Sequence, residues 1–308
     1  MLTGIHFLLS YTCNFECDHC FVFSSPAAEG TFTIRQIQAA LEGAWNIGTV
    51  EWIYFEGGEP CLYYPLMLEG VKRARAMGFQ VGVVTNAYFA ASVEDARLWL
   101  QPLADLGIAD LSVSDDAYHY ENAEDNPPKR AIACARELGM PVASLCIEEP
   151  TVEGPTIEGP SEQGTVEPKK GDPVVGGDVM FRGRAVEKLV EGLPRQPWKE
   201  FTECPYEDLQ DPSRVHLDCY GNVHLCQGIS MGNMWQTPLS KLVRDYKAEA
   251  HPICAPLVGG GPAALAEAYE VDRQDGYVDA CHLCYDMRLH LLERFPQYLA
   301  PRQVYGIE

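Results

Sequence analysis

The stretch of sequence that decides the fold of this chain reads Tyr11-Thr12-Cys13-Asn14-Phe15-Glu16-Cys17-Asp18-His19-Cys20-Phe21. Its cysteines form a C-x3-C-x2-C pattern. Three thiolates this close are poorly spaced to pair with one another, but they can converge on one soft metal centre, because thiolate sulfur selects iron–sulfur clusters, zinc and Cu(I). Three cysteines leave one iron of a four-iron cluster open, and an open metal position is typical of catalytic sites. A zinc knuckle completed by His6 or His19 is the alternative.

A second motif, Gly57-Gly58-Glu59-Pro60, directly follows a strand predicted over residues 50–55. Ligands collect at the carboxyl ends of parallel strands. The two glycines allow the backbone to approach a ligand closely, and Glu59 can accept a charge-assisted hydrogen bond from an ammonium group. The motif alone is weak evidence, since Gly and Pro also punctuate ordinary turns.

Together, the two motifs resemble the signature of the radical SAM superfamily, with His19 at its usually aromatic position. The resemblance implies a [4Fe–4S] cluster on Cys13, Cys17 and Cys20, whose open iron chelates S-adenosylmethionine. It implies reductive cleavage to a 5′-deoxyadenosyl radical that abstracts hydrogen from a substrate, and an electron donor such as flavodoxin or ferredoxin. The residues it assigns to cofactor binding here are Gly57, Gly58, Glu59, Pro60 and His19.

Three further positions resemble the same family less sharply. Asn86 ends a predicted strand, as does Ser114, whose alternatives as a contact to the cofactor's ribose are Asp115 and Asp116. Arg184 lies in a Gly-Arg-Ala segment similar to one in SPASM and Twitch-type enzymes. Each has a plainer explanation, because Asn, Ser and Asp favour turns after strands and an arginine before a helix can simply be solvated.

The C-terminal third carries a second set of cysteines. Cys281-His282-Leu283-Cys284 has the C-x2-C spacing that aims two sulfurs at one metal, and a tight hairpin turn predicted at Gly221-Asn222 returns Cys226 toward the same place. The arrangement resembles a Twitch domain, a shortened SPASM domain, which implies an auxiliary [4Fe–4S] cluster on Cys204, Cys226, Cys281 and Cys284. Because the gap after Cys204 is long, Cys219 can replace it and Cys254 can complete the set. A zinc ribbon is the structural alternative.

Strand and helix signals alternate through the first half of the chain, which predicts an α/β fold with a parallel sheet, a partial (β/α)6 TIM-like barrel. Strands are expected over 4–10, 50–55, 79–85, 111–114 and 141–147, and helices over 33–47, 66–77, 93–106 and 127–138. We place a radical SAM core at 1–195 and a small Cys-rich Twitch-like domain at 196–308. The Pro/Gly/Glu-rich segment 149–177 predicts a surface loop, with a lid over the barrel as the alternative.

Composition limits the classes of partner. The chain has 308 residues, 46% of them hydrophobic, and a formal net charge of −21, which argues against a nucleic-acid surface and an anionic membrane face. No signal peptide and no apolar run long enough for a membrane span is evident. Twelve cysteines, several in short clusters, favour metal ligands in a reducing cytoplasm over disulfides.

The resemblance to SPASM and Twitch-type enzymes implies peptide or protein modification as the activity. Radical dehydrogenation of a small polar metabolite is one alternative, and a non-catalytic iron–sulfur or zinc protein is another. Because the sequence opens almost directly at the first strand, we expect no N-terminal peptide-recognition domain. Cys61 is a candidate hydrogen donor to a substrate radical, although burial explains it as well as it explains Cys134 and Cys146.

Overall fold

The computed structural model describes residues 1–122, 124–154, 156–160, 166–170 and 173–307. The strands are β1 (Gly4–Ser10), β2 (Trp52–Gly57), β3 (Gln80–Thr85), β4 (Asp110–Ser114), β5 (Val142–Leu145), β6 (Thr151–Glu153), β7 (Thr156–Pro160), β8 (Val166–Lys170), β9 (Val174–Gly176), β10 (Gln196–Pro197), β11 (Arg214–Asp218), β12 (Asn222–Cys226), β13 (Ile229–Asn233) and β14 (Gly276–Tyr277). The helices are α1 (Ile34–Ile47), α2 (Tyr64–Ala76), α3 (Val93–Asp105), α4 (Pro127–Glu137), α5 (Arg184–Lys188), α6 (Leu239–Asp245), α7 (Cys254–Ala268) and α8 (Ala280–Leu291), with a 3-10 turn η1 (Pro60–Tyr63) after β2.

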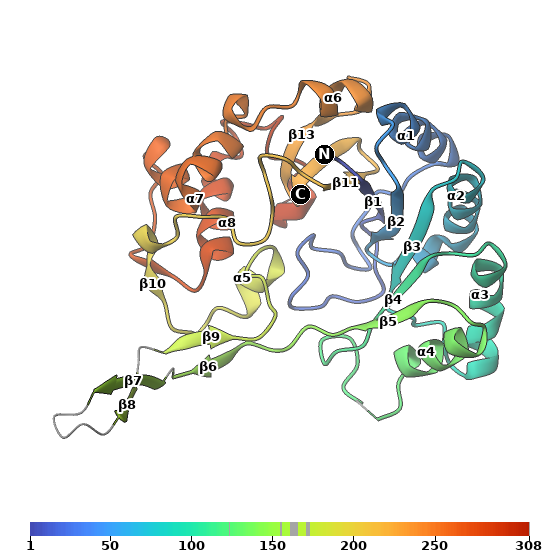
Figure 1. Cartoon of the computed structure of the whole chain (residues 1–308), viewed down its shortest axis with the longest axis horizontal. Helices are drawn as coiled ribbons and strands as arrows, with labels where there is room; N and C mark the ends of the chain where they lie inside the picture. The colour runs from blue at the N-terminus through green and yellow to red at the C-terminus, as the bar shows by residue number, and fades with distance from the viewer. Residues whose placement is uncertain (123, 155, 161–165, 171–172, 308) are drawn as a thin grey trace.

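One curved sheet organises the molecule, with α1 to α4 along its outer side (Figure 1). Its strand order is β13-β12-β11-β1-β2-β3-β4-β5. The strands from β11 to β5 are parallel, and β12 and β13 are antiparallel additions. The predicted α/β fold is therefore confirmed, and the sheet crosses the boundary expected near residue 195, since its sixth parallel strand is β11.

Local sequence signals explain where the helices begin and end. Thr33 caps α1 through a capping box with Gln36, and Gly48 ends the helix in the left-handed conformation, as expected for these residue types. Asn126 caps α4, and Pro127 follows at the first turn, where proline loses no hydrogen bond. The strands and helices expected in the first half all form, with ends shifted by a few residues.

Side-chain alternation along β1 separates the core from the barrel interior. Ile5, Phe7 and Leu9 are fully buried, and Phe7 packs on Phe32 and Phe55. Successive side chains of a strand point to opposite faces, so His6 and Leu8 face the other side of the sheet. That inner side carries the polar groups described below.

The described part of 149–177 corrects the expectation of a plain surface loop. β6 pairs with β9 and β7 pairs with β8, both antiparallel. The imperfect repeat T-[VI]-E-G-P supplies β-branched residues, which favour extended backbone. Residues 155, 161–165 and 171–172, on which the lid hypothesis also rests, lie outside the described residues. Cys146 was expected to be buried but is exposed, because β5 is an edge strand that ends before it.

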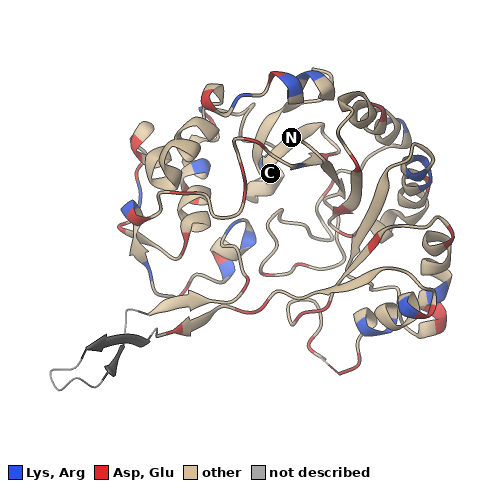
Figure 2. Ribbon diagram, in the orientation of Figure 1, with Lys and Arg blue, Asp and Glu red and all other residues tan. Residues whose placement is uncertain are grey.

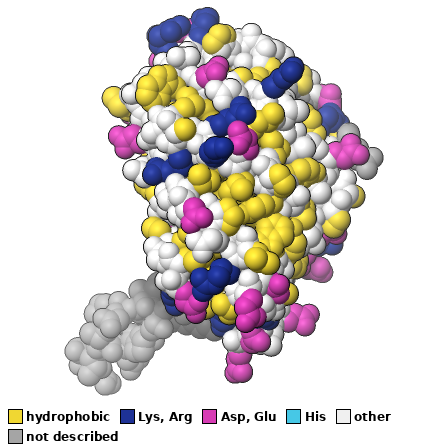
Figure 3. Space-filling view, turned by 90° about the vertical axis from the view of Figure 1, so that its right-hand side faces the viewer, with side chains coloured by type: hydrophobic (Ala, Val, Ile, Leu, Met, Phe, Trp, Pro, Cys, Tyr) yellow, Lys and Arg dark blue, Asp and Glu magenta, His cyan; other side chains and the backbone are white. Residues whose placement is uncertain are grey.

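The surface carries both charges and apolar groups. Lys and Arg lie mainly on helices, whereas Asp and Glu also follow the loops (Figure 2). The face on the right of Figure 1 mixes apolar side chains with charged ones (Figure 3), and Leu98 is among the exposed apolar residues, with 75% of its surface accessible. Among the described residues, every helix is too short or too polar to span a bilayer.

Candidate active site

A cavity of about 260 Å³ opens at the carboxyl ends of β1 to β5. It collects residues from the cysteine loop, from the ends of these strands and from the segment before α5. The lining residues are Leu8, Cys13, Phe15, Cys17, His19, Cys20, Phe21, Val22, Ser24, Glu56, Gly57, Gly58, Val84, Thr85, Asn86, Ser114, His119, Leu145, Ile147, Asp178, Val179, Met180 and Arg182. This is the end of a parallel sheet at which ligands bind.

The three N-terminal cysteines all line this cavity. The backbone N–H of Phe15 donates to Cys13 Sγ at 3.4 Å, and that of Ser24 donates to Cys20 Sγ at 3.3 Å. Burial raises the pKa of Cys13 to about 12, so without a metal its thiol is protonated at neutral pH. Three cysteines that line one cavity, two of them with N–H donors to their sulfurs, fit the ligand set of an iron–sulfur cluster, whose potential such hydrogen bonds tune.

Gly57 and Gly58 bring backbone, not side chains, to the cavity wall. A Cβ atom on Gly58 would lie 2.1 Å from the carbonyl oxygen of Thr12, so only glycine fits. The N–H of Gly58 donates to Ser10 O, and the N–H of Glu59 donates to Thr12 O. The two predicted motifs are therefore joined directly through their backbones.

Glu59 does not line the cavity, although the sequence suggested that its carboxylate meets the cofactor's ammonium group. The residue is fully buried. Its oxygens accept hydrogen bonds from Cys61 N at 2.9 Å, Thr85 Oγ1 at 2.7 Å and Asn86 N at 2.8 Å. The carboxylate thus orders the end of β3. Pro60, predicted with it, is buried at the start of η1.

The predicted residues at the ends of β3 and β4 divide into two groups. Asn86 and Ser114 line the cavity, and Asn86 Nδ2 donates to Asn14 Oδ1 at 2.9 Å. Asp115 does not line it, because its Oδ1 accepts a hydrogen bond from Asn126, the cap of α4. Asp116, the other alternative, is buried, and its Oδ1 lies 2.7 Å from His119 Nδ1.

His19 and Arg184 both make contacts that stabilise the cysteine loop. His19 lines the cavity and packs on Tyr118, with ring centroids 4.5 Å apart, and burial lowers its pKa to about 4, so the ring is neutral. Arg184 lies behind the loop, outside the cavity lining. Its guanidinium donates to Cys17 O at 2.9 Å and to Ser24 O at 2.7 Å.

Four of the C-terminal cysteines surround a second, small cavity of about 20 Å³: Cys204, Cys226, Cys281 and Cys284. Burial raises the pKa of Cys284 to about 12, so its thiol is protonated at neutral pH when no metal is bound. Four cysteines around one cavity fit a soft metal centre. The long sequence gap after Cys204 had suggested that another cysteine could replace it. In the structure, Cys204 nevertheless lines the same cavity as Cys226, Cys281 and Cys284.

The remaining cysteines line neither cavity. Burial raises the pKa of Cys254 to about 12, and Cys226, Cys284 and Cys204 add to that rise, so Cys254 lies near three of the four C-terminal cysteines. Cys219 is beside Gly30 in the cysteine loop, and Cys254 is fully buried at the start of α7. Cys61 is also buried, with Thr85 Oγ1 3.7 Å from its sulfur, and it does not line the larger cavity. Cys134 is buried inside α4, as expected.

Sequence reasoning missed Arg182, which lines both cavities. Its Nη1 donates to Cys226 Sγ at 3.0 Å, and its buried Nε has no hydrogen-bond partner among the described residues. The sequence Phe-Arg-Gly-Arg-Ala contains two arginines, and only the second matched the family segment. Glu56, also missed, lines the larger cavity next to the two glycines.

Comparison with known proteins gives a match to a protein family. Residues 7–158, which carry both N-terminal motifs, match the family model described as Radical SAM superfamily. YydG of Bacillus subtilis (strain 168), a protein named for peptide biosynthesis, is 24% identical over 129 residues, which is 42% of this chain and 40% of that relative. The match thus spans less than half of the relative's length.

Among solved structures, BtrN in complex with AdoMet and 2-DOIA aligns with a TM-score of 0.49 at 16% identity, covering 80% of this chain and 83% of BtrN. Native anSMEcpe with bound AdoMet aligns with a TM-score of 0.46 at 12% identity, covering 100% of both chains.

Proposed function

We propose that this chain, which belongs to the radical SAM superfamily through the domain at residues 7–158, removes a hydrogen atom from a peptide or protein substrate. One observation carries the proposal: the thiols of Cys13, Cys17 and Cys20 line the same cavity as the backbone of the Gly57-Gly58 pair. When bound, a [4Fe–4S] cluster and S-adenosylmethionine supply a 5′-deoxyadenosyl radical by one-electron cleavage.

The chain's own residues hold and orient these groups. The three thiolates ligate the cluster, and the glycine backbone leaves room for the methionyl end of the cofactor. Asn86 and Ser114 offer polar atoms to the rest of that molecule from the ends of β3 and β4. Glu59 acts indirectly, by accepting hydrogen bonds from the Thr85 hydroxyl and the Asn86 backbone N–H. Arg184 also acts indirectly, by donating to two carbonyls of the cysteine loop.

We also propose that Cys204, Cys226, Cys281 and Cys284 hold an auxiliary [4Fe–4S] cluster. Arg182 supports this assignment, because its guanidinium lies against Cys226 and lines both cavities. A buried cation beside sulfur ligands compensates the negative charge of thiolates. Because Arg182 lines both cavities, its guanidinium can contact a substrate that lies near the second cluster.

Two observations support a peptide substrate. The relative in Bacillus subtilis is named for peptide biosynthesis. In addition, β5 is an edge strand with largely exposed side chains, and Leu145 at its end lines the cavity. Extended peptides bind such edges by adding a strand, which would bring a peptide residue to the cavity mouth.

The test of the enzyme proposal is anaerobic reconstitution with iron and sulfide, followed by dithionite and S-adenosylmethionine, with 5′-deoxyadenosine measured by mass spectrometry. We expect 5′-deoxyadenosine from the natural chain and none above background from Cys17→Ser. Cys146→Ser is the matched control, because Cys146 is exposed and lines neither cavity. Equal product from natural chain and Cys17→Ser would overturn the proposal.

Iron analysis tests the auxiliary cluster. We expect roughly eight irons per chain in the natural protein and about four in Cys281→Ala/Cys284→Ala, since each cluster holds four. Substrate class is tested by adding peptides or small polar metabolites to the same assay. A metabolite that is converted where peptides are not would overturn the peptide assignment while leaving the enzyme assignment intact.

A further inference from the structure

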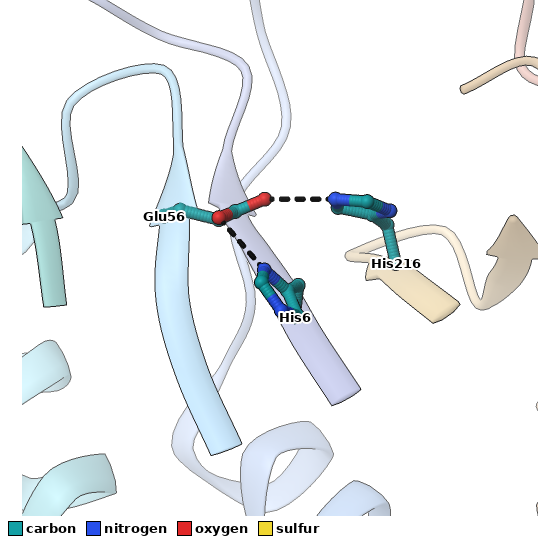
Figure 4. Close-up of side chains that lie close together, drawn as sticks. All are labelled: His6, Glu56 and His216. Carbon is teal, nitrogen blue, oxygen red and sulfur yellow. Dashed lines mark hydrogen bonds and ion pairs between the residues drawn. The ribbon is translucent and has the colours of Figure 1, made fainter. Parts of the chain in front are cut away.

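Three ligand-type side chains that no cysteine site uses meet on the inner side of the sheet: His6 on β1, Glu56 on β2 and His216 on β11 (Figure 4). His6 Nδ1 lies 2.9 Å from Glu56 Oε2, and His216 Nε2 lies 3.1 Å from Glu56 Oε1. The ligand atoms of the three residues all lie within 4.8 Å of one another. Each imidazole thus contacts a different oxygen of the Glu56 carboxylate.

The scaffold that presents these side chains is rigid. His6 and His216 are direct partners in the parallel pairing of β1 with β11, and Glu56 pairs with Leu8 across β1 and β2. The His6 ring stacks on Tyr54, with centroids 4.5 Å apart and planes 15° apart. Sites built on adjacent strands hold their geometry better than sites on loops.

We propose that His6, Glu56 and His216 bind one divalent transition-metal ion of the zinc type, with an open position toward the larger cavity. Two imidazole nitrogens and a carboxylate are a ligand set used by catalytic zinc sites. Nitrogen and oxygen donors also suit zinc, whereas the two cysteine sets suit iron–sulfur clusters. The proposed ion therefore does not compete with either cluster for its ligands.

The chemistry of the three side chains agrees with a ligand role. Carboxylates and imidazoles bind metal ions in their deprotonated forms, and the ligand atoms of His6, Glu56 and His216 already face one another within 4.8 Å.

Gln227 contacts both ring nitrogens of His216. Its side-chain amide nitrogen lies 3.2 Å from Nε2 and 3.5 Å from Nδ1. Its buried amide oxygen has no hydrogen-bond partner among the described residues, so a polar atom without a partner lies next to the proposed site.

Glu56 lines the cavity directly beside Gly57 and Gly58. An ion bound here would present its open position to a substrate oxygen in the cavity. That use of the ion rests on the proposed function, whereas the binding of the ion does not. The test below therefore measures the ion itself, independently of 5′-deoxyadenosine formation.

The experiment titrates ZnSO4 into cluster-reconstituted protein, whose cysteines are occupied, and measures bound zinc and iron by mass spectrometry after dialysis. We expect one zinc per chain in the natural protein and at least tenfold weaker zinc binding in Glu56→Gln and in His216→Asn, with iron content unchanged. His290→Asn is the matched control, since His290 is an exposed histidine beside the carboxylate of Asp286; it should bind zinc like the natural chain.

Absence of stoichiometric zinc in the natural protein would overturn the proposal and leave a hydrogen-bonded triad. So would unchanged zinc affinity in Glu56→Gln with normal iron content. A third ligand variant, His6→Asn, is included so that two variants can still be compared at equal iron content if one loses iron or unfolds. The zinc content of the natural chain is independent of all three variants, and its absence alone overturns the proposal.

Discussion

At the scale of single residues, Gly58 shows how tightly the two halves of the proposed cofactor site are fitted. A Cβ there would lie 2.1 Å from Thr12 O and 3.0 Å from Tyr11 O. Both are backbone atoms, which cannot swing aside like the end of a side chain. We expect Gly58→Ala to push the cysteine loop away from β2 and to lower the iron content by the share of the N-terminal cluster, about four irons.

Gly259→Ala is the control for Gly58→Ala, because nothing lies within 4 Å of a Cβ at Gly259. Iron per chain and the melting temperature are measured in both variants. Full iron content in Gly58→Ala would show that the loop tolerates the displacement.

His251 predicts a pH dependence of stability. Its Nδ1 accepts hydrogen bonds from the N–H groups of Ile253 and Cys254, and its Nε2 lies 3.0 Å from Ser230 O. Burial lowers the pKa of His251, so the folded chain holds it neutral, while in the unfolded chain it titrates near pH 6.5. The unfolded state therefore binds more protons below that pH, and stability falls as pH falls.

The measurement compares melting temperatures at pH 7.5 and pH 5.5 in the natural chain and in His251→Asn. Asparagine can accept the same N–H groups but does not titrate in this range. We expect the natural chain to lose more of its melting temperature on acidification than the variant does. Equal losses would mean that His251 does not contribute.

At the scale of elements, the edge of β5 makes the peptide hypothesis testable. Leu111 N donates to Pro141 O, and Asp115 N donates to Leu145 O, so β4 bonds to alternate residues of β5. The residues between, including Ser144, direct their N–H groups away from the sheet. Proline is tolerated at such an edge position because it removes only an outward donor.

We expect Ser144→Pro to keep its iron and its peptide-independent formation of 5′-deoxyadenosine, while the KM for a peptide substrate rises at least tenfold. The control is Ser144→Ala, which keeps the N–H and should behave like the natural chain. A Ser144→Pro variant with unchanged KM would exclude strand addition at β5.

The break in α7 is a second element with a testable role. Gly261 has φ +65°, and a Cβ there would lie 2.3 Å from Glu203 N, next to Cys204. We expect Gly261→Ala to shift that segment and to lower iron by the share of the auxiliary cluster, about four irons, whereas formation of 5′-deoxyadenosine persists at first turnover. Iron analysis beside Cys281→Ala/Cys284→Ala checks this, and full iron content would contradict it.

Sequence patterns predicted what depends on neighbours in the chain. The helix that begins near Thr33 and the turn at Gly221 were predicted, because the residues that determine them lie within a few positions of one another. The sequence did not predict that Arg182, and not Arg184, lines the cavity. That placement depends on where the segment before α5 meets two cysteine loops that are distant in the sequence. The His6–Glu56–His216 cluster was equally hidden, because it needs the pairing of β11 with β1.

At the scale of the whole molecule, that same pairing joins the N-terminal and C-terminal parts. β11 lies between β1 and β12 in one sheet, and it covers an edge of β1 whose residues include the fully buried Ile5 and Phe7. Tyr11 OH also donates to Asp218 Oδ2 at the end of β11. The boundary proposed near residue 195 therefore separates the two cysteine sets along the chain, but it does not divide the sheet, which contains strands from both sides of it.

We accordingly expect a fragment of residues 1–195 not to fold by itself, although it contains every residue proposed to hold the N-terminal cluster. Without β11, the edge of β1 is left unpaired and apolar surface of the core is exposed, which favours aggregation. Circular dichroism and iron content of the purified fragment are compared with those of full-length Cys204→Ala, which disrupts the auxiliary site but keeps β11. The full-length variant should stay folded with about four irons. A soluble fragment with four irons and a cooperative melting transition would show instead that β1 to β5 form an independent folding unit.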